Sequence, residues 1–214
     1  MRIEESAAGQ PGPGDADPPR AARPEVWLVR HGETEWARDL RHTGRTDAPL
    51  TDVGRAQGKS LAAALAGVGF DVVLSSPRSR ALDTARLAGF GDRVRVDDDL
   101  AEWDYGRYEG LTTEEIRVER PGWTIWRDGG DGGETPENVA RRADRIVGRV
   151  RTVDGRVLVF SHGHFLRVFA ARWLDLPPSE GRLFALDTAT ISVLGWDRDA
   201  RVVERWNVDP RPTA

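Results

Sequence analysis

Two histidines stand where a short apolar run meets a glycine. His31 lies in the run Val-Arg-His-Gly at residues 29–32, and His162 lies in Phe-Ser-His-Gly at residues 160–163. Both runs are typical of buried strands, and strands of an α/β protein direct their carboxyl ends toward one crevice. A single histidine of this kind more often caps a strand. Two of them, in a chain with only four histidines, favour a shared site.

An imidazole beside arginine is suited to moving a phosphoryl group. When one ring nitrogen is held as a donor, the other keeps a free lone pair that can attack phosphorus. The transferred group needs positive charge around its oxygens, and arginine forks or a second imidazolium supply that charge without a metal. His31 therefore fits a nucleophile, and Arg30 and His162 are placed to bind the phosphate.

The composition excludes several other classes of protein. A formal charge of -4 and a pI near 5.7 do not favour a nucleic-acid partner. The absence of cysteine excludes disulfides, thiolate nucleophiles and Cys-ligated zinc. Apolar stretches long enough for a membrane span are absent, and residues 1–24 lack the apolar run of a secretory signal. We expect a cytoplasmic protein with a disordered tail at residues 1–24 and one domain at residues 25–214.

The elements that must position these histidines alternate between strands and helices. The expected strands are 25–30, 70–74, 94–96, 156–160, 190–196 and 201–206, and the expected helices are 55–66, 76–88, 135–150 and 162–174. Residues 97–133 are expected to form an excursion with short helices over the carboxyl edge of the sheet. The pattern predicts an α/β fold, a three-layer α/β/α sandwich with a mostly parallel central sheet.

Further motifs strengthen the phosphoryl-transfer interpretation. Residues 30–34 read Arg-His-Gly-Glu-Thr, and residues 41–44 read Arg-His-Thr-Gly. With these motifs the sequence resembles the histidine phosphatase superfamily, once called the phosphoglycerate mutase family, over about residues 26–206. The resemblance implies a phosphoglycerate mutase-like fold, phosphorylation of His31 and phosphate binding by Arg30 and His162. It also implies that Thr43 and Gly44 line the approach of the substrate.

Two more segments look like motifs of this family. The run 75–85, Ser-Ser-Pro-Arg-Ser-Arg-Ala-Leu-Asp-Thr-Ala, implies that Arg80, and not Arg78, is the remaining phosphate ligand. The run 101–106, Ala-Glu-Trp-Asp-Tyr-Gly, is similar to the segment that holds the general acid. Glu102 is the expected acid and later the base toward water, with Asp104 as its competitor. A bound phosphate dianion is expected to raise the pKa of Glu102.

Other residues near these motifs have less definite roles. Tyr105 and His164 are expected to contact the substrate, although a structural role for His164, and equally for His42, fits the sequence as well. His162 and His164 lack a third metal ligand nearby, so neither a metal nor a cofactor is expected. The glycine-rich run 129–133 does not follow a strand and is interpreted as a mobile loop, not as a phosphate cradle.

The family contains mutases, phosphatases and non-catalytic binders, so the motifs leave the reaction open. The segment between Glu102 and His162 is shorter than in the cofactor-dependent mutases of the family. It also lacks an evident counterpart of the basic cluster with which those enzymes bind the carboxylate of their substrate. Its motifs are most similar to those of acid phosphatase and sugar-bisphosphatase members. The sequence therefore predicts a metal-independent phosphatase of small phosphomonoesters, with sugar phosphates as the favoured class. The alternatives are a cofactor-dependent phosphoglycerate mutase and a non-catalytic phospholigand-binding module.

The expected partner is a small-molecule phosphoester, without nucleic acid or membrane, and a homodimer is left open.

The sequence departs from the family at one position of the first motif. Ala37 stands where the family often has asparagine. One hydrogen bond to the phosphate is therefore expected to be missing or replaced.

Overall fold

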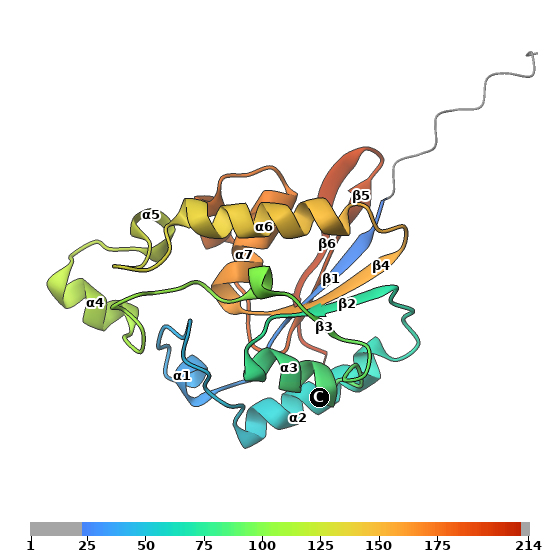
Figure 1. Ribbon diagram of the computed structural model, residues 1–214, viewed down its shortest axis with the longest axis horizontal. Coiled ribbons are helices and arrows are strands. Elements are labelled where there is room, and N and C mark those ends of the chain that lie inside the picture. The colour runs from blue at the N-terminus through green and yellow to red at the C-terminus, as the bar shows by residue number, and fades with distance from the viewer. Residues whose placement is uncertain (1–22, 211–214) are drawn as a thin grey trace, which may run out of the picture.

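The computed structural model describes residues 23–210 and forms one six-stranded sheet with helices on both faces (Figure 1). The predicted tail, residues 1–24, lies outside the described residues except for Arg23 and Pro24, as do residues 211–214 of the predicted domain. The strands are β1 (Glu25–Arg30), β2 (Val72–Ser75), β3 (Arg95–Val96), β4 (Arg156–Ser161), β5 (Ile191–Asp197) and β6 (Ala200–Val208).

The helices are short apart from those that cover the sheet. They are α1 (Glu35–Arg38), α2 (Asp52–Leu65), α3 (Ser79–Leu87), α4 (Thr113–Glu119), α5 (Ile125–Asp128), α6 (Pro136–Val150) and α7 (Gly163–Trp173), with 3₁₀ turns η1 (Asp98–Leu100) and η2 (Pro178–Leu183). None of the described helices has the length and apolarity needed to cross a lipid bilayer.

The two faces of the sheet bury separate apolar clusters. Along β1, Val26 and Leu28 point into a cluster with α6 and α7, whereas Trp27 and Val29 point into one with α2 and α3. Side chains of a strand alternate between its faces, so a strand that is apolar throughout must be covered on both sides. Figure 1 shows these helix pairs on opposite faces, which confirms the predicted α/β sandwich.

The sheet is parallel where the site lies. Its order is β3-β2-β4-β1-β5-β6. The strands β3, β2, β4 and β1 are parallel to one another, β5 is antiparallel to β1, and β6 is antiparallel to β5. In the pairing of β1 with β4, Arg30 lies opposite Ser161. The next residue of each strand is a predicted site histidine, so both histidines leave the same edge of the sheet.

Two helices begin at other residues than the sequence predicts, for local reasons. Helix α2 begins before residue 55, at Asp52, because the Thr51 hydroxyl accepts a hydrogen bond from the Gly54 N–H. The helix predicted from residue 76 begins at Ser79, because the Ser76 hydroxyl accepts from the Arg78 N–H and holds a turn before it. The four-residue helix α1 and the six-residue 3₁₀ segment η2 were not predicted, since segments this short have no readable periodicity.

The loop after β1 packs closely on the start of α2. A Cβ atom added to Gly54 would lie 2.1 Å from the Glu33 carbonyl oxygen, and one added to Gly32 would lie 2.4 Å from the Gly54 carbonyl oxygen. Backbone this close leaves no space for a side chain at either position. The two glycines therefore fix the path of the loop that carries His31.

Candidate active site

The ends of β1 and β4 bring the two predicted histidines together. The His31 N–H donates to the Ser161 carbonyl at 3.0 Å, which continues the pairing of the strands by one residue. The imidazole centroids of His31 and His162 lie 5.1 Å apart, and both side chains are buried. The crevice expected from the two strand ends is therefore present.

His31 has one nitrogen fixed and the other free. Its Nδ1 atom lies 2.7 Å from the Gly32 carbonyl oxygen. A carbonyl oxygen only accepts, so Nδ1 carries the proton and Nε2 keeps the lone pair. Burial, together with the charges of Arg80 and Arg30, holds the pKa of His31 well below its ordinary value. The ring is therefore a neutral nucleophile even in mildly acidic solution.

His162 and Arg80 form a fully buried pair behind His31. The Arg80 Nε donates to His162 Nδ1 at 3.2 Å, and His162 Nε2 lies 2.7 Å from the Ser76 hydroxyl. Arginine is only a donor, so His162 carries its proton on Nε2 and is neutral. Burial is the largest cause that lowers the pKa of His162. Ser76, which the sequence analysis did not assign, thus orients this ring from within the run 75–85.

The two Nη atoms of Arg80 bind the loop that follows α1. Nη2 donates to the Thr43 carbonyl at 2.9 Å, and Nη1 donates to the Thr46 carbonyl at 2.8 Å. Its side chain is buried without a close carboxylate, because the Asp47 oxygen is 4.0 Å away. Asp47 therefore compensates the charge of Arg80 only weakly beside His31. An anion in the cavity would be attracted to that charge.

Arg30 has an unused donor in the same region. Its Nη1 donates to the Leu186 carbonyl at 2.5 Å, whereas its buried Nε has no hydrogen-bond partner among the described residues. A Cβ atom added to Gly163 would lie 3.3 Å from this Nε, so glycine keeps the region beside the donor clear. A buried N–H without a partner is uncommon and fits an anion site.

Glu102 lies at the amino end of α7. Its Oε1 accepts from the N–H groups of Trp103 at 2.8 Å and Phe165 at 2.9 Å, and its Oε2 accepts from the His164 N–H at 3.0 Å. These bonds favour the carboxylate, but burial is the larger influence and raises the pKa of Glu102. A buried carboxyl with a raised pKa suits a general acid.

Asp104, the competing acid, is directed elsewhere. Its Oδ2 atom forms an ion pair with Arg45 at 2.7 Å, and its Oδ1 atom accepts from the Gly106 N–H. It does not line the cavity into which Glu102 opens. Glu102 is therefore the better candidate of the two.

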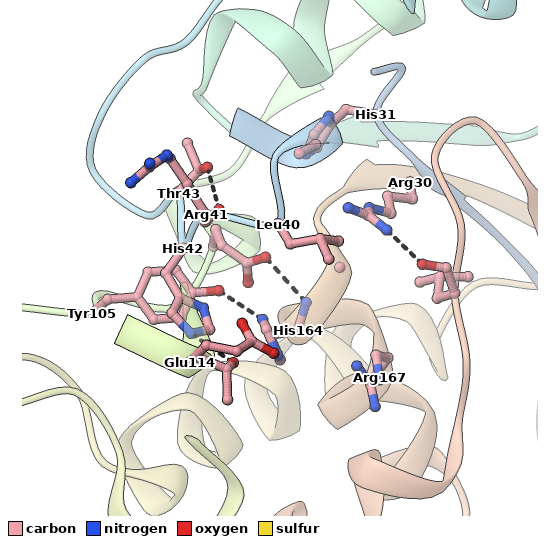
Figure 2. A pocket seen from close by; sticks show the side chains of 15 residues that line it. Arg30, His31, Leu40, Arg41, His42, Thr43, Tyr105, Glu114, His164 and Arg167 are labelled. Atoms are coloured by element: carbon pink, nitrogen blue, oxygen red, sulfur yellow. Dashed lines mark hydrogen bonds between the residues drawn. The ribbon is translucent and has the colours of Figure 1, made fainter. Parts of the chain in front are cut away.

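A cavity of about 310 Å³ is lined by Arg30, His31 and Glu102, whereas Arg80 and His162 are not among its lining residues. Phosphate binding by Arg80 and His162 therefore stays a prediction. Figure 2 shows His31 and Arg30 on one side of the cavity and His164, Tyr105 and Arg167 across from them. The lining residues are Arg30, His31, Ala37, Leu40, Arg41, His42, Thr43, Glu102, Tyr105, Thr113, Glu114, Gly163, His164, Arg167 and Leu186. Of the predicted substrate contacts, Thr43, Tyr105 and His164 line this cavity, and the Tyr105 hydroxyl lies 2.7 Å from His164 Nδ1.

Gly44 lies behind the cavity wall. Its N–H donates to the two carboxylate oxygens of Glu109 at 2.9 and 3.1 Å, and a Cβ atom there would lie 2.3 Å from the Trp103 carbonyl oxygen. The structure thus gives Gly44 a close backbone approach, and its contact with substrate stays a prediction.

The glycine-rich run 129–133 also makes close backbone contacts. A Cβ atom on Gly133 would lie 2.2 Å from the Asp104 carbonyl oxygen, and the Arg107 N–H donates to the Asp131 carbonyl at 2.8 Å. These residues pack against the segment that follows Glu102, a role that the interpretation as a mobile loop did not include.

Several lining residues were not assigned from the sequence, among them Arg41, Arg167 and Leu40. Arg41 precedes His42 and Arg167 follows His164 by three residues, so both were visible near the motifs, but the sequence did not show where their side chains point. Leu40 gave no signal. It is 75% exposed at the cavity and has a left-handed backbone with φ of 56°, which is uncommon for leucine.

A neutral histidine, buried cations and a buried carboxyl group are the parts that phosphoryl transfer needs, and comparison with known proteins agrees. The family model of the histidine phosphatase superfamily (branch 1) matches residues 26–209, and the chain belongs to that family. The family predicted from the sequence motifs is therefore confirmed. Within residues 23–210 the structure contains no cluster of three or more side chains suited to a metal ion.

Two relatives of high identity are named as phosphatases. The chain is 46% identical to an acid phosphatase of Mycobacterium tuberculosis, over 81% of this chain and 87% of that protein. It is 40% identical to sedoheptulose 1,7-bisphosphatase of Saccharomyces cerevisiae, over 72% and 68% of the two chains. The solved structure of an open reading frame product of Mycobacterium tuberculosis matches with a TM-score of 0.84 and 42% identity, covering 88% and 99%.

The opposite shifts of pKa at His31 and Glu102 predict how activity depends on pH. Since the pKa of His31 is lowered, the nucleophile stays neutral as pH falls, and kcat/KM should not decline between about pH 6.5 and about pH 5. Since the pKa of Glu102 is raised, its acid form should persist to higher pH than usual and be lost as pH rises through that pKa.

A pH profile of the wild type and Glu102→Gln on one substrate checks both statements. The decline at high pH should weaken in the variant, while titration of the substrate phosphate is common to both. A wild-type profile that falls on the acid side near the ordinary histidine pKa would contradict the neutral buried nucleophile.

Proposed function

We propose that this protein is a metal-independent phosphatase that hydrolyses small phosphomonoesters through a phosphohistidine on His31. The observation that carries the proposal is the tautomer of His31, whose Nδ1 is fixed by Gly32 so that Nε2 has a free lone pair. That lone pair belongs to a ring lining a cavity that also holds Arg30 and Glu102. A nucleophile, cations and an acid are the parts that phosphoryl transfer needs.

In the first step Nε2 of His31 attacks phosphorus, and the bond from phosphorus to the ester oxygen breaks. The Glu102 carboxyl gives its proton to that leaving oxygen, so the alcohol departs neutral. Arg30 and Arg80 stabilise the equatorial oxygens of the phosphoryl group, and His162 is held against Arg80. In the second step water attacks phosphorus and gives a proton to the Glu102 carboxylate. The bond from nitrogen to phosphorus then breaks, which releases phosphate.

This set of groups favours hydrolysis over the two alternatives. A binding module needs neither a nucleophile with a lowered pKa nor a buried acid, and both are present. A mutase is supported by weaker likeness, since the chain is 29% identical to a probable phosphoglycerate mutase of Cronobacter sakazakii. Two relatives of higher identity, at 46% and 40%, are named as phosphatases.

The cations of the cavity indicate the class of substrate. Arg167 lines it, stacks on the Trp126 ring at 4.4 Å and donates to the carbonyls of Gly181 and Arg182. Its hydrogen bonds among the described residues thus go to carbonyl groups and not to carboxylates. A cation held by packing and carbonyls is available for a second anionic group. Sugar phosphates that carry a second phosphate therefore fit the cavity, in line with the bisphosphatase relative.

Arg167→Ala should raise KM for a sugar bisphosphate by about 10-fold or more while changing KM for the matching monophosphate by less than about threefold, because a charge-assisted bond is lost only from the former. Arg182→Ala is the control, since its exposed side chain binds Glu180 and its carbonyl still accepts from Arg167. Equal losses on both substrates would contradict the second anion site.

A cytoplasmic location stays a prediction from the sequence, and a homodimer stays open. Sedimentation of the purified protein would measure the oligomeric state.

The proposed function is tested by phosphate release from a panel of sugar phosphates, sugar bisphosphates and 3-phosphoglycerate, with and without EDTA. Release should resist EDTA and be lost in His31→Ala. Activity that survives in His31→Ala would refute the phosphohistidine, and release abolished by EDTA would refute metal independence. Exchange between phosphoglycerate isomers without release would favour the mutase, and binding without turnover would favour the module.

A further inference from the structure

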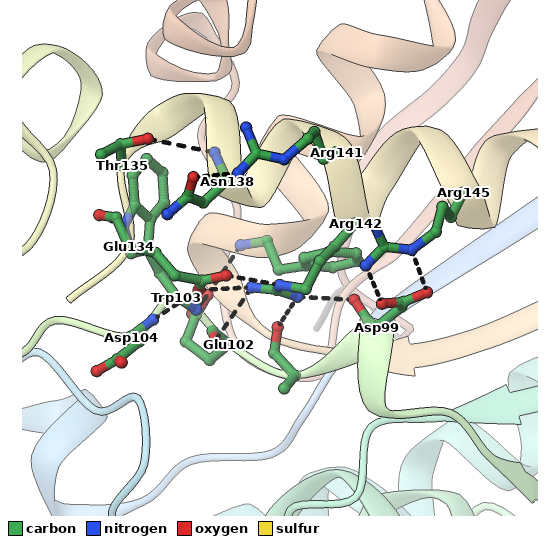
Figure 3. A network of polar contacts seen from close by, with 12 residues as sticks. Asp99, Glu102, Trp103, Asp104, Glu134, Thr135, Asn138, Arg141, Arg142 and Arg145 are labelled. Atoms are coloured by element: carbon green, nitrogen blue, oxygen red, sulfur yellow. Dashed lines mark hydrogen bonds and ion pairs between the residues drawn. The ribbon is translucent and has the colours of Figure 1, made fainter.

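Arg142 on α6 does not line the cavity, yet its guanidinium group forms hydrogen bonds with the segment that carries Glu102 (Figure 3). Its Nη1 donates to the carbonyls of Asp99 at 2.7 Å and Ala101 at 2.9 Å, and its Nη2 donates to the Glu102 carbonyl at 3.4 Å. These three carbonyls belong to the backbone immediately before and at the general acid.

The remaining donors of Arg142 bind Glu134. Nε and Nη2 each donate to one carboxylate oxygen of Glu134 at 2.8 Å. A guanidinium group has five N–H donors in a rigid plane, and these five contacts use all of them. Lysine, with three donors and no plane, cannot reproduce this arrangement.

Glu134 fixes the other side of the same segment. Its Oε2 accepts from the Asp104 N–H at 3.0 Å, and its backbone carbonyl accepts from the Trp103 indole at 2.9 Å. The Glu134 N–H donates to the Asp104 carbonyl at 2.9 Å. The pair Arg142 and Glu134 therefore binds residues 99–104 on both sides of Glu102.

The carboxylate of Glu102 is held separately, by the N–H groups at the start of α7. Arg142 also lies over the Phe165 ring at 5.1 Å, and Phe165 is one of the residues whose N–H binds Glu102. Backbone and carboxylate of the acid are thus fixed by two elements that touch each other at Arg142. A displacement of about 1 Å at a reacting group can lower a rate by about 100-fold.

We propose that Arg142 and Glu134 are positioning residues that place Glu102 for proton transfer to the leaving group. The proposal rests on the proposed function, because it needs Glu102 to act as the acid. The ion pair of Arg142 and Glu134 does not line the cavity. Its proposed role is in one chemical step, proton transfer from Glu102 to the leaving group, and goes beyond support of the fold.

The leaving group separates positioning from support. An alkyl alkoxide needs a proton in order to depart, whereas 2,4-dinitrophenolate does not. We would measure the rate of phosphoenzyme formation by rapid quench for a sugar phosphate and for 2,4-dinitrophenyl phosphate. Arg142→Ala should lower the first rate by about 10-fold to 100-fold and the second by less than about threefold. Arg142→Lys should fail to restore the first rate, because it lacks the planar fork.

Arg145→Ala is the matched control. Arg145 lies on the same helix and binds the same segment, but through the half-buried carboxylate of Asp99, which Arg149 also holds. Its loss should change both rates by less than about twofold, because the Arg145 side chain is exposed and Arg149 still binds Asp99. If Arg142→Ala does not fold, as judged by circular dichroism, Arg142→Lys and Glu134→Gln carry the test.

Two results would overturn the inference. Equal losses for both substrates in the folded variants would mean that the pair only supports the fold. Full activity of Arg142→Lys would mean that the fork is not required. Glu102→Gln in the same assay should show the same dependence on the leaving group. If it does not, the acid role of Glu102 fails, and the positioning role fails with it.

Discussion

The pairing of β1 with β4 is the constraint on which the site depends. These parallel strands place Arg30 opposite Ser161, so the residues that follow, His31 and His162, leave the sheet side by side. A shift of one residue would turn the apolar side chains of β1 toward the wrong faces. The two apolar clusters that stabilise the sheet thus also fix the distance between the histidines.

Around this strand pair the protein buries cations instead of ion pairs. Arg80 is held by backbone carbonyls and His162, and Arg30 by the Leu186 carbonyl. Burying charge is unfavourable unless it is solvated by fixed dipoles, and here carbonyl groups provide that solvation without neutralising the charge. Burial is the largest cause that lowers the pKa of His31, and these cations lower it further, so its ring stays neutral. The cations that would attract an anion therefore also help to keep the lone pair of His31 free.

The strands and the histidine pair were predictable because each rests on a local signal. The continuous apolar runs at residues 25–30 and 156–160 indicated buried strands, and His31 and His162 followed them directly. Glu102 required the resemblance to a family, since a lone carboxylate in an irregular segment has no local signal. The structure adds its burial and its place at the start of α7.

Other features depend on contacts between distant residues and gave no signal. The donors of Arg142 reach carbonyls at residues 99–102, and carbonyl positions follow from the path of the chain, not from residue types. The same holds for Gly44 and the glycines of residues 129–133, whose close backbone contacts appear only once the excursion is folded. Ser76 lay inside a recognised motif, but its bond to His162 joins two strands.

The central claim is that the phosphoryl group passes through Nε2 of His31. Mass spectrometry of the protein quenched during turnover at alkaline pH, where phosphohistidine survives, tests it most directly. The account predicts one added phosphoryl group on the peptide containing His31, lost on acid treatment and absent in His31→Ala. A phosphoryl group on another residue would contradict it. So would turnover without any phosphorylated intermediate under conditions in which hydrolysis of the intermediate is slower than its formation.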